Sequence, residues 1–185
     1  ISSAGDINGD GFADLLISAP GADPNGNYSA GSNYVVFGRA ASFDATFDLS
    51  SLNGSNGFRL DGAASGDYSS TARSAGDVNG DGFDDLIVGA SAFSAMGGRL
   101  DSAYVIWGRV EAISTSLDLS SLRSSDGFRL EGLNLGEDLG HFVSNAGDFN
   151  GDGLGDIIIG SPMDESCYLV FGKNAEFDAV LNLQA

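Results

Sequence analysis

Short apolar runs separated by polar, glycine-rich segments recur along the chain. Runs of leucine and β-branched residues begin at Asp14 (DLLISAP), Asp85 (DLIVGAS) and Asp156 (DIIIGSP). Runs of this length bounded by glycine and proline are typical of buried strands. No segment keeps apolar residues at i, i+3, i+4 and i+7 over the length of a helix. The pattern therefore predicts an all-β protein.

Further strand-like runs accompany each of these segments. They are YVVFG at Tyr34, YVIWG at Tyr104, YLVFG at Tyr168, GFRLDG at Gly57, GFRLEG at Gly127, SSTARSAG at Ser69 and GHFVSNAG at Gly140. Four short antiparallel strands per unit, joined by Gly, Asn and Ser turns, are typical of one blade of a β-propeller. The segment DLSSL, at Asp48 and again at Asp118, is expected to be loop, with at most one turn capped by the aspartate.

An acidic loop repeats together with the strands. DINGDGFAD, DVNGDGFDD and DFNGDGLGD start at Asp6, Asp77 and Asp148, at intervals of 71 residues. A period of this length indicates an array of supersecondary units. We interpret residues 1–185 as a single array of about two and a half to three blades. Its repeats cover about 1–66, 67–136 and 137–185, and the third is incomplete.

The loops concentrate negative charge that a cation would neutralise. Carboxylates this close raise one another's pKa unless a positive charge lies between them. Calcium takes six to eight oxygen ligands, and spacing at loop positions 1, 3, 5, 7 and 9 wraps oxygens around one ion, with position 7 using its main-chain carbonyl. We predict three Ca²⁺ sites with the ligands Asp6, Asn8, Asp10, Phe12, Asp14; Asp77, Asn79, Asp81, Phe83, Asp85; and Asp148, Asn150, Asp152, Leu154, Asp156.

Three other interpretations of the loops fit less well. An EF-hand needs flanking helices and a glutamate at position 12, where this chain has Ile17, Val88 and Ile159. Turn formation alone requires only one or two of the five residues, yet all five positions are kept in three copies. Magnesium is also a poorer fit, because it usually keeps several waters and takes few protein ligands.

The acidic loop followed by an apolar strand ending in Gly-Ala-Pro resembles the FG-GAP repeat. That repeat is the blade unit of integrin α-subunit β-propellers and of many bacterial surface proteins. The matching tripeptides Ser18–Pro20, Gly89–Ser91 and Gly160–Pro162 each differ by one residue, and the FG element keeps only Gly140. The resemblance covers essentially the whole chain. It implies a calcium-binding propeller of a secreted or cell-surface protein, with an adhesion or extracellular structural role.

Composition excludes several other classes. A formal charge of −18 with eight basic residues argues against nucleic acid and anionic membrane surfaces. A content of 42% hydrophobic residues is too high for a disordered chain. No stretch is long and apolar enough to span a membrane. Cys167 is the only cysteine, so no intramolecular disulfide can form, and we expect it to be a small buried residue.

No catalytic arrangement is visible, and we expect the chain not to be an enzyme. His141 is the only histidine, no GxSxG motif lies nearby, and a partly buried structural role is expected for it. Trp107 is expected to pack within a core strand. A lectin-like array using exposed aromatics such as Tyr28 or Tyr68 is an alternative. A noncatalytic propeller attached to a secreted hydrolase is another.

The number of blades is too small for closure. Propellers usually contain about four to eight blades. The chain could be part of a larger propeller, one subunit of a ring, or a subunit of a self-assembling extracellular filament. Its protein or glycan partner is not identified by the sequence. Arg59 with Asp61, and Arg129 with Glu131, are expected to form surface salt bridges.

Overall fold

The computed structural model describes residues 1–91, 100–110 and 114–183. The described part is all-β, and its helical segments are three-residue 3₁₀ turns. Its strands are β1 (Ser2–Gly5), β2 (Asp14–Ala19), β3 (Ser32–Val36), β4 (Gly57–Asp61), β5 (Thr71–Gly76), β6 (Asp85–Ala90), β7 (Ser102–Ile106), β8 (Ser116–Asp118), β9 (Gly127–Glu131), β10 (Phe142–Gly147), β11 (Asp156–Ser161), β12 (Ser166–Val170) and β13 (Val180–Asn182). The 3₁₀ turns are η1 (Pro24–Gly26), η2 (Leu49–Ser51), η4 (Leu119–Ser121) and η5 (Pro162–Asp164). None of these helices is long and apolar enough to cross a membrane.

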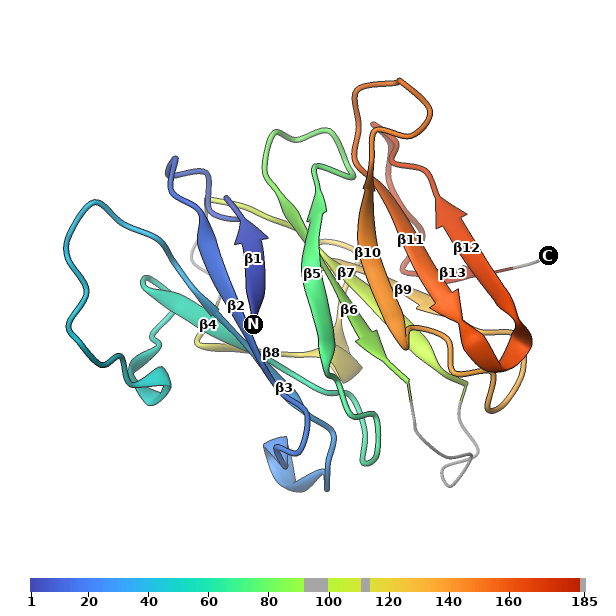
Figure 1. Cartoon of the computed structure of the whole chain (residues 1–185), viewed down its shortest axis with the longest axis horizontal. Helices are drawn as coiled ribbons and strands as arrows, with labels where there is room; N and C mark the ends of the chain where they lie inside the picture. Colours follow the sequence, from blue (N-terminus) through green and yellow to red (C-terminus); the bar gives the residue numbers. More distant parts are fainter. Residues whose placement is uncertain (92–99, 111–113, 184–185) are drawn as a thin grey trace.

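The strands form three blades that lie side by side (Figure 1). The first blade is the antiparallel series β1–β2–β3–β4, and the second is β5–β6–β7–β9. The third blade contains β10, β11 and β12 in the described part. The three sheets do not close into a ring. The prediction of propeller-like antiparallel blades is therefore confirmed, with four antiparallel strands in each of the first two blades and three in the described part of the third.

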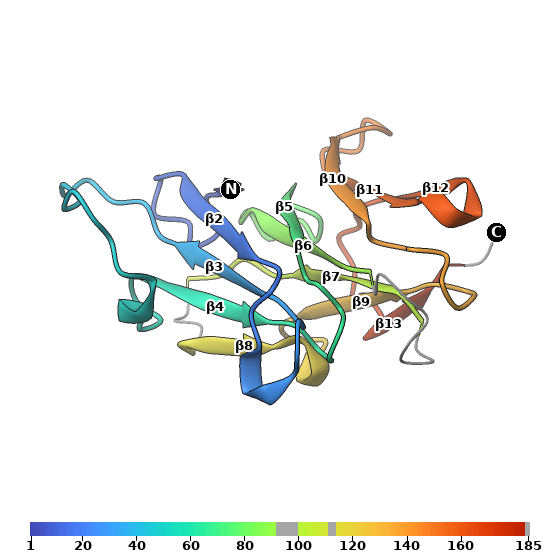
Figure 2. The ribbon, with the colours of Figure 1, turned by 60° about the horizontal axis from the view of Figure 1, so that its bottom comes forward.

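Two of the blades carry an additional strand from the following repeat. β8 pairs in parallel with β4, and β13 pairs in parallel with β9 (Figure 2). β8 begins just before the second DLSSL segment, so the expectation that Asp118 lies in a loop was wrong. The strand ends where the Asp118 carboxylate caps η4 by accepting from the Ser120 amide at 2.8 Å. Pairing with a distant strand, which no local pattern reveals, makes this segment extended.

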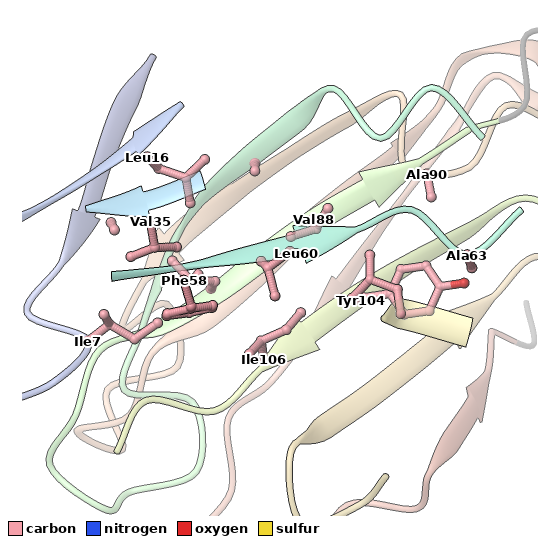
Figure 3. Close-up of a cluster of buried hydrophobic side chains, with 14 residues drawn as sticks. Ile7, Leu16, Val35, Phe58, Leu60, Ala63, Val88, Ala90, Tyr104 and Ile106 are labelled. Atoms are coloured by element: carbon pink, nitrogen blue, oxygen red, sulfur yellow. The ribbon is translucent and has the colours of Figure 1, made fainter. Parts of the chain in front are cut away.

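The middle blade buries both of its faces because alternate side chains point to opposite neighbours. Leu86, Val88, Tyr104 and Ile106 pack against the first blade (Figure 3). Ile87, Ala103 and Val105, from the alternate positions, pack against the third blade. This double burial explains why the strands appear in the sequence as continuous apolar runs. Truncating one such buried leucine or isoleucine to alanine typically costs about 2–5 kcal/mol.

Cys167 is exposed, contrary to the expectation of a buried residue. It pairs with Gly160 on the side of the third blade that faces away from the second. Its equivalent in the second blade, Ala103, is fully buried because the third blade covers it. Among the described residues nothing covers the corresponding face of the third blade, so the thiol meets solvent.

In the ion pair between Arg59 and Asp61, the arginine side chain is partly exposed and the aspartate side chain is buried. Arg59 Nε and Nη2 donate to the two Asp61 oxygens at 2.6 and 2.7 Å, and the Asp61 side chain is 2% exposed. The salt bridge that was expected at the surface is therefore partly buried. Asp61 Oδ1 also accepts a hydrogen bond from the Ser32 hydroxyl at 3.1 Å. This bidentate contact raises the pKa of Arg59 further above its ordinary value.

Two aromatic predictions can be compared directly with the packing. The Trp107 ring contacts Phe128 and Phe177, at centroid distances of 5.4 and 5.5 Å, so its role in packing is confirmed. The His141 side chain is 40% exposed, and Nδ1 lies 2.9 Å from Asp138 Oδ2. Its ring packs edge-on against Phe142. The histidine is therefore partly buried, as expected, and contacts both of these residues.

Candidate metal centres

The three acidic loops lie at one edge of the array, where each joins the first and second strands of its blade (Figure 1). A β-bulge leads into every loop, with register shifts before Gly5, Gly76 and Gly147. The φ angles of these glycines lie between 72° and 78°, in the left-handed region. Glycine tolerates this conformation, and the bulge turns the chain out of the sheet.

Within each loop, the glycines at positions 4 and 6 are also left-handed. Gly9 and Gly11 have φ angles of 71° and 86°, and the corresponding angles in the other two loops lie between 77° and 90°. Because glycine adopts this conformation without steric cost, these glycines permit a sharp turn. The turn brings the side chains of positions 1, 3 and 5 to one side of a short stretch of backbone.

The side-chain oxygens of positions 1 and 3 converge on the same backbone amide. In the first loop Asp10 N donates to Asp6 Oδ1 and to Asn8 Oδ1, both at 3.0 Å. The second loop has the corresponding bonds from Asp81 N at 3.1 and 2.9 Å, and the third has them from Asp152 N at 2.9 Å each. The side-chain oxygens of positions 1 and 3 thus both face the amide of position 5 in every loop.

Position 5 is held by its neighbours in the same way in all three loops. In the first loop Asp10 Oδ1 accepts from Phe12 N at 2.9 Å, and Asp10 Oδ2 accepts from Asn8 Nδ2 at 3.0 Å. The asparagine therefore orients the aspartate while its own oxygen faces the loop backbone. The equivalent bonds recur at Asp81 and Asp152 with distances of 2.8–3.0 Å.

The aspartate at position 9 has a second role that sequence reasoning missed. Asp14 is 3% exposed, and its two oxygens accept from Ile7 N at 3.0 Å and from Gly38 N at 2.8 Å. It thereby ties its own loop to a glycine just beyond the third strand of the blade. Asp85 joins Val78 N to Gly108 N, and Asp156 joins Phe149 N to Gly172 N, at 2.7–2.9 Å.

The glycines that receive these bonds are the last residues of the YVVFG, YVIWG and YLVFG runs. A Cβ at Gly38, Gly108 or Gly172 would overlap a main-chain carbonyl oxygen near the end of the acidic loop. Only glycine lets the two chain segments approach this closely. The recurring glycine after an aromatic residue was the sequence signal for this link.

Burial raises the pKa of two of the position 9 carboxyls, those of Asp14 and Asp85. It raises the pKa of Asp14 to about 6, and the nearby carboxylates Asp10 and Asp6 add to the increase, whereas the two amide bonds oppose it. The same causes raise the pKa of Asp85 to about 7. Buried negative charge near other carboxylates is unfavourable without a counter-ion. A bound cation would relieve this cost.

The oxygen atoms in each loop are of the chemical types that calcium binds. Each loop offers carboxylate, amide and carbonyl oxygens, the hard ligands that calcium prefers. In the described part of the chain, no arginine or lysine forms an ion pair with any of the loop aspartates at the predicted positions. Counting only His, Cys, Asp and Glu, no group of three described residues is arranged to hold a metal ion. A calcium site here would therefore also depend on the asparagine and on main-chain oxygen.

Successive loops are linked to one another. Asp84 N donates to Asp6 O at 3.3 Å, and Gly155 N donates to Asp77 O at 2.7 Å. The position 7 side chain of each later loop packs over a glycine of the loop before it: a Cβ at Gly9 would meet the Phe83 ring, and one at Gly80 would meet the Leu154 side chain. The candidate sites form a connected row across the blades.

Comparison with known proteins accounts for this threefold arrangement. The family profile described as "FG-GAP repeat" matches residues 1–36, 73–106 and 140–169. Each matched segment spans one loop and the strands on either side of it. The chain belongs to the FG-GAP repeat family. The resemblance inferred from the loops and the Gly-Ala-Pro-like tripeptides is thus confirmed.

Individual relatives of this FG-GAP chain fall into two groups. It is 30% identical to "Integrin alpha-PS5" of Drosophila melanogaster and 30% identical to "Integrin alpha-4" of Xenopus laevis, with 90% of this chain covered in each case. It is also 30% identical, over 88% of its length, to "Phosphatidylinositol-glycan-specific phospholipase D" of Rattus norvegicus. The matched region is 15%, 14% and 18% of those proteins, so the chain spans less than a fifth of their length.

Proposed function

We propose that this FG-GAP array is a calcium-binding propeller module of a secreted or cell-surface protein, with an adhesion or extracellular structural role. The observation that carries the proposal is the identical convergence of aspartate and asparagine oxygens on one amide in three loops. The similarity to integrin α subunits supports the extracellular placement and the interaction role.

In this proposal calcium supplies the positive charge that the loops lack. Positions 1, 3, 5 and 9 of each loop hold the ion through side chains, and position 7 through its carbonyl. The ions fix the loops against one another, and the ordered row of loops stiffens the edge of the array. Calcium modules outside the cell typically bind with dissociation constants on the order of 10⁻⁴ to 10⁻³ M.

Thermal unfolding with and without calcium tests the proposal. Because a ligand that binds only the folded state stabilises it by mass action, EDTA should lower the melting temperature and added calcium should raise it in a concentration-dependent way. Equilibrium dialysis should give three bound calcium ions per chain. Magnesium at equal concentration should be less effective.

Substitutions of the aspartate at position 5 of each loop, compared with a control substitution outside the loops, test the three sites one at a time. Asp10→Asn, Asp81→Asn and Asp152→Asn should each remove one bound ion and leave the other two. Asp164→Asn, which changes an exposed aspartate in η5 outside the loops, should leave all three. Identical melting curves in EDTA and in calcium, together with no dialysed metal, would defeat the proposal.

A second role is favoured by the phospholipase matches, namely a noncatalytic propeller attached to a secreted hydrolase. The chain itself is proposed to lack catalysis, because no GxSxG motif lies near His141, its only histidine. Purified chain should not hydrolyse phosphodiester or glycoside substrates. Activity that survives purification and is lost in His141→Ala would contradict this assignment.

A further inference from the structure

In each complete blade, a segment of the following repeat pairs in parallel with the outermost strand. Arg59 N, on β4, donates to Thr115 O at 3.0 Å, directly before β8. Arg129 N, on β9, donates to Ala179 O at 3.0 Å, directly before β13. The same bond at the same position of two blades shows that this parallel strand is a regular part of the array.

The first repeat contains an equivalent of this segment. FDLSSL at 47–52 matches LDLSSL at 117–122, which places Phe47 at the position of Leu117. Residues 46–48 belong to none of the strands that the structure describes. Asp48 nevertheless caps η2 by accepting from Ser50 N at 2.9 Å, as Asp118 caps η4. The turn that positions the segment therefore forms without a strand partner.

The side chains of this segment line an open apolar groove. Leu117 packs against the core between the first two blades, and Leu119 is 2% exposed. Their equivalents Phe47 and Leu49 border a groove of about 450 Å³, together with Leu15, Ile17, Phe43 and neighbouring residues. An apolar groove beside an unpaired segment is the form expected of an incomplete interface.

The strand residues of the groove have buried counterparts in the second blade. Leu15 and Ile17 occupy the positions of Leu86 and Val88, which are both fully buried against the first blade. Leu15 is 42% exposed. The internal repeat thus shows what covers such a face, because the same face of the second blade is covered by a preceding blade.

The first acidic loop lies at the same end of the array, and in the described part of the chain no earlier loop lies under its position 7 side chain. Phe83 and Leu154 pack over glycines of the preceding loops. Phe12, at the same loop position, is 42% exposed. Loop, sheet face and segment 46–48 therefore all present surfaces that are occupied by a preceding blade elsewhere in this chain.

We propose that residues 46–48 add as a fifth, parallel strand to the fourth strand of a further FG-GAP blade, whose apolar face covers the groove. The partner is a blade with an unpaired Gly-Phe-Arg-Leu type strand. A second copy of residues 1–185 does not offer one in the described part, since β4 and β9 already carry β8 and β13 and the third blade contains no such strand. The proposal does not depend on calcium binding.

An extended chain tests the pairing. A second copy of residues 72–142, fused directly to the amino group of Ile1, continues the 71-residue repeat and supplies one additional blade. Amide hydrogen exchange of residues 45–49 should slow by about tenfold or more relative to the 185-residue protein, because paired strand amides are protected. Residues 115–119, already paired, should exchange slowly in both chains and serve as the internal control.

Phe47→Pro in the extended chain should reverse the protection of the flanking amides. Equally fast exchange of 45–49 in both chains, with the added blade itself protected, would overturn the proposal. Should the added blade fail to fold, a peptide of residues 124–132 is added in excess to the 185-residue protein. Protection by this peptide but not by its Arg129→Pro form supports the pairing, and no protection by either overturns it.

Discussion

At the scale of single residues, the aspartates at positions 5 and 9 of the acidic loops are of two kinds. Those at position 5 are exposed and bond only within their own loop. Those at position 9 are buried and join the loop to the end of the third strand. Spacing alone predicted all of them as metal ligands. It could not distinguish the two kinds, because the glycine amide that position 9 reaches lies 23 or 24 residues away in the first two repeats and 16 away in the third.

The two kinds of aspartate should respond differently to the same substitution. Asp85→Asn leaves two buried amides facing an amide side chain that can accept from only one of them, and should lower the unfolding free energy by about 1–3 kcal/mol even in EDTA. Asp81→Asn should change it by less than about 0.5 kcal/mol in EDTA, because that side chain is exposed. Both should weaken stabilisation by calcium.

Urea denaturation of Asp85→Asn and Asp81→Asn, each in EDTA and in calcium, measures these four changes in unfolding free energy. Equal destabilisation by the two variants in EDTA would mean that Asp85 does not link the loop to Gly108. Either the Val78 or the Gly108 amide should also exchange faster in Asp85→Asn, since one of the two loses its acceptor.

At the scale of elements, the second and third strands of each blade were predictable because apolar runs between glycine-rich turns reveal them locally. The parallel outer strands were not. β8 contains Ser116, Leu117 and Asp118, which alone favour neither a strand nor a loop, and it becomes extended only where β4 offers an open edge. Its counterpart at 46–48, with a similar sequence, is not a strand in the described chain.

A matched pair of proline substitutions measures what the partner strand contributes. Leu117→Pro removes a backbone donor from β8 and disturbs a side chain that packs against the core, so it should destabilise the protein by about 2–3 kcal/mol. Phe47→Pro in the same 185-residue chain should cost less than about 1 kcal/mol, since residue 47 lies in no described strand there. Thermal and urea unfolding of both variants gives the comparison, and similar losses would show that the strand pairing adds little.

At the scale of the whole molecule, the described chain is an array with two open ends. The first blade exposes the groove beside Phe47, and the third exposes Phe142 at 62% and Phe171 at 48%. Exposed apolar patches of this kind mark interaction surfaces. The described array therefore presents an uncovered apolar face at each end.

Cys167 gives a direct measure of the open end at the third blade. Its thiol is exposed in this structure and should react with a thiol reagent such as DTNB in the folded protein without denaturant. Reaction only after unfolding would show that the face is covered in solution, and dependence of the reaction rate on protein concentration would identify self-association as the cover. Cys167→Ser, which removes the only thiol, is the blank.

The all-β class, the threefold repeat and the resemblance to FG-GAP repeats could be recognised from the amino-acid sequence alone, because they depend on local alternation, turn residues and the spacing within each loop. The metal ligands inferred from that spacing stay a prediction. Tertiary structure decided the rest. The buried state of Asp14, Asp85 and Asp156, the parallel pairing of β8 and β13, and the exposure of Cys167 all depend on which blade lies beside which. These contacts join residues far apart in the chain, and a similar local segment takes a different state when its neighbour is absent.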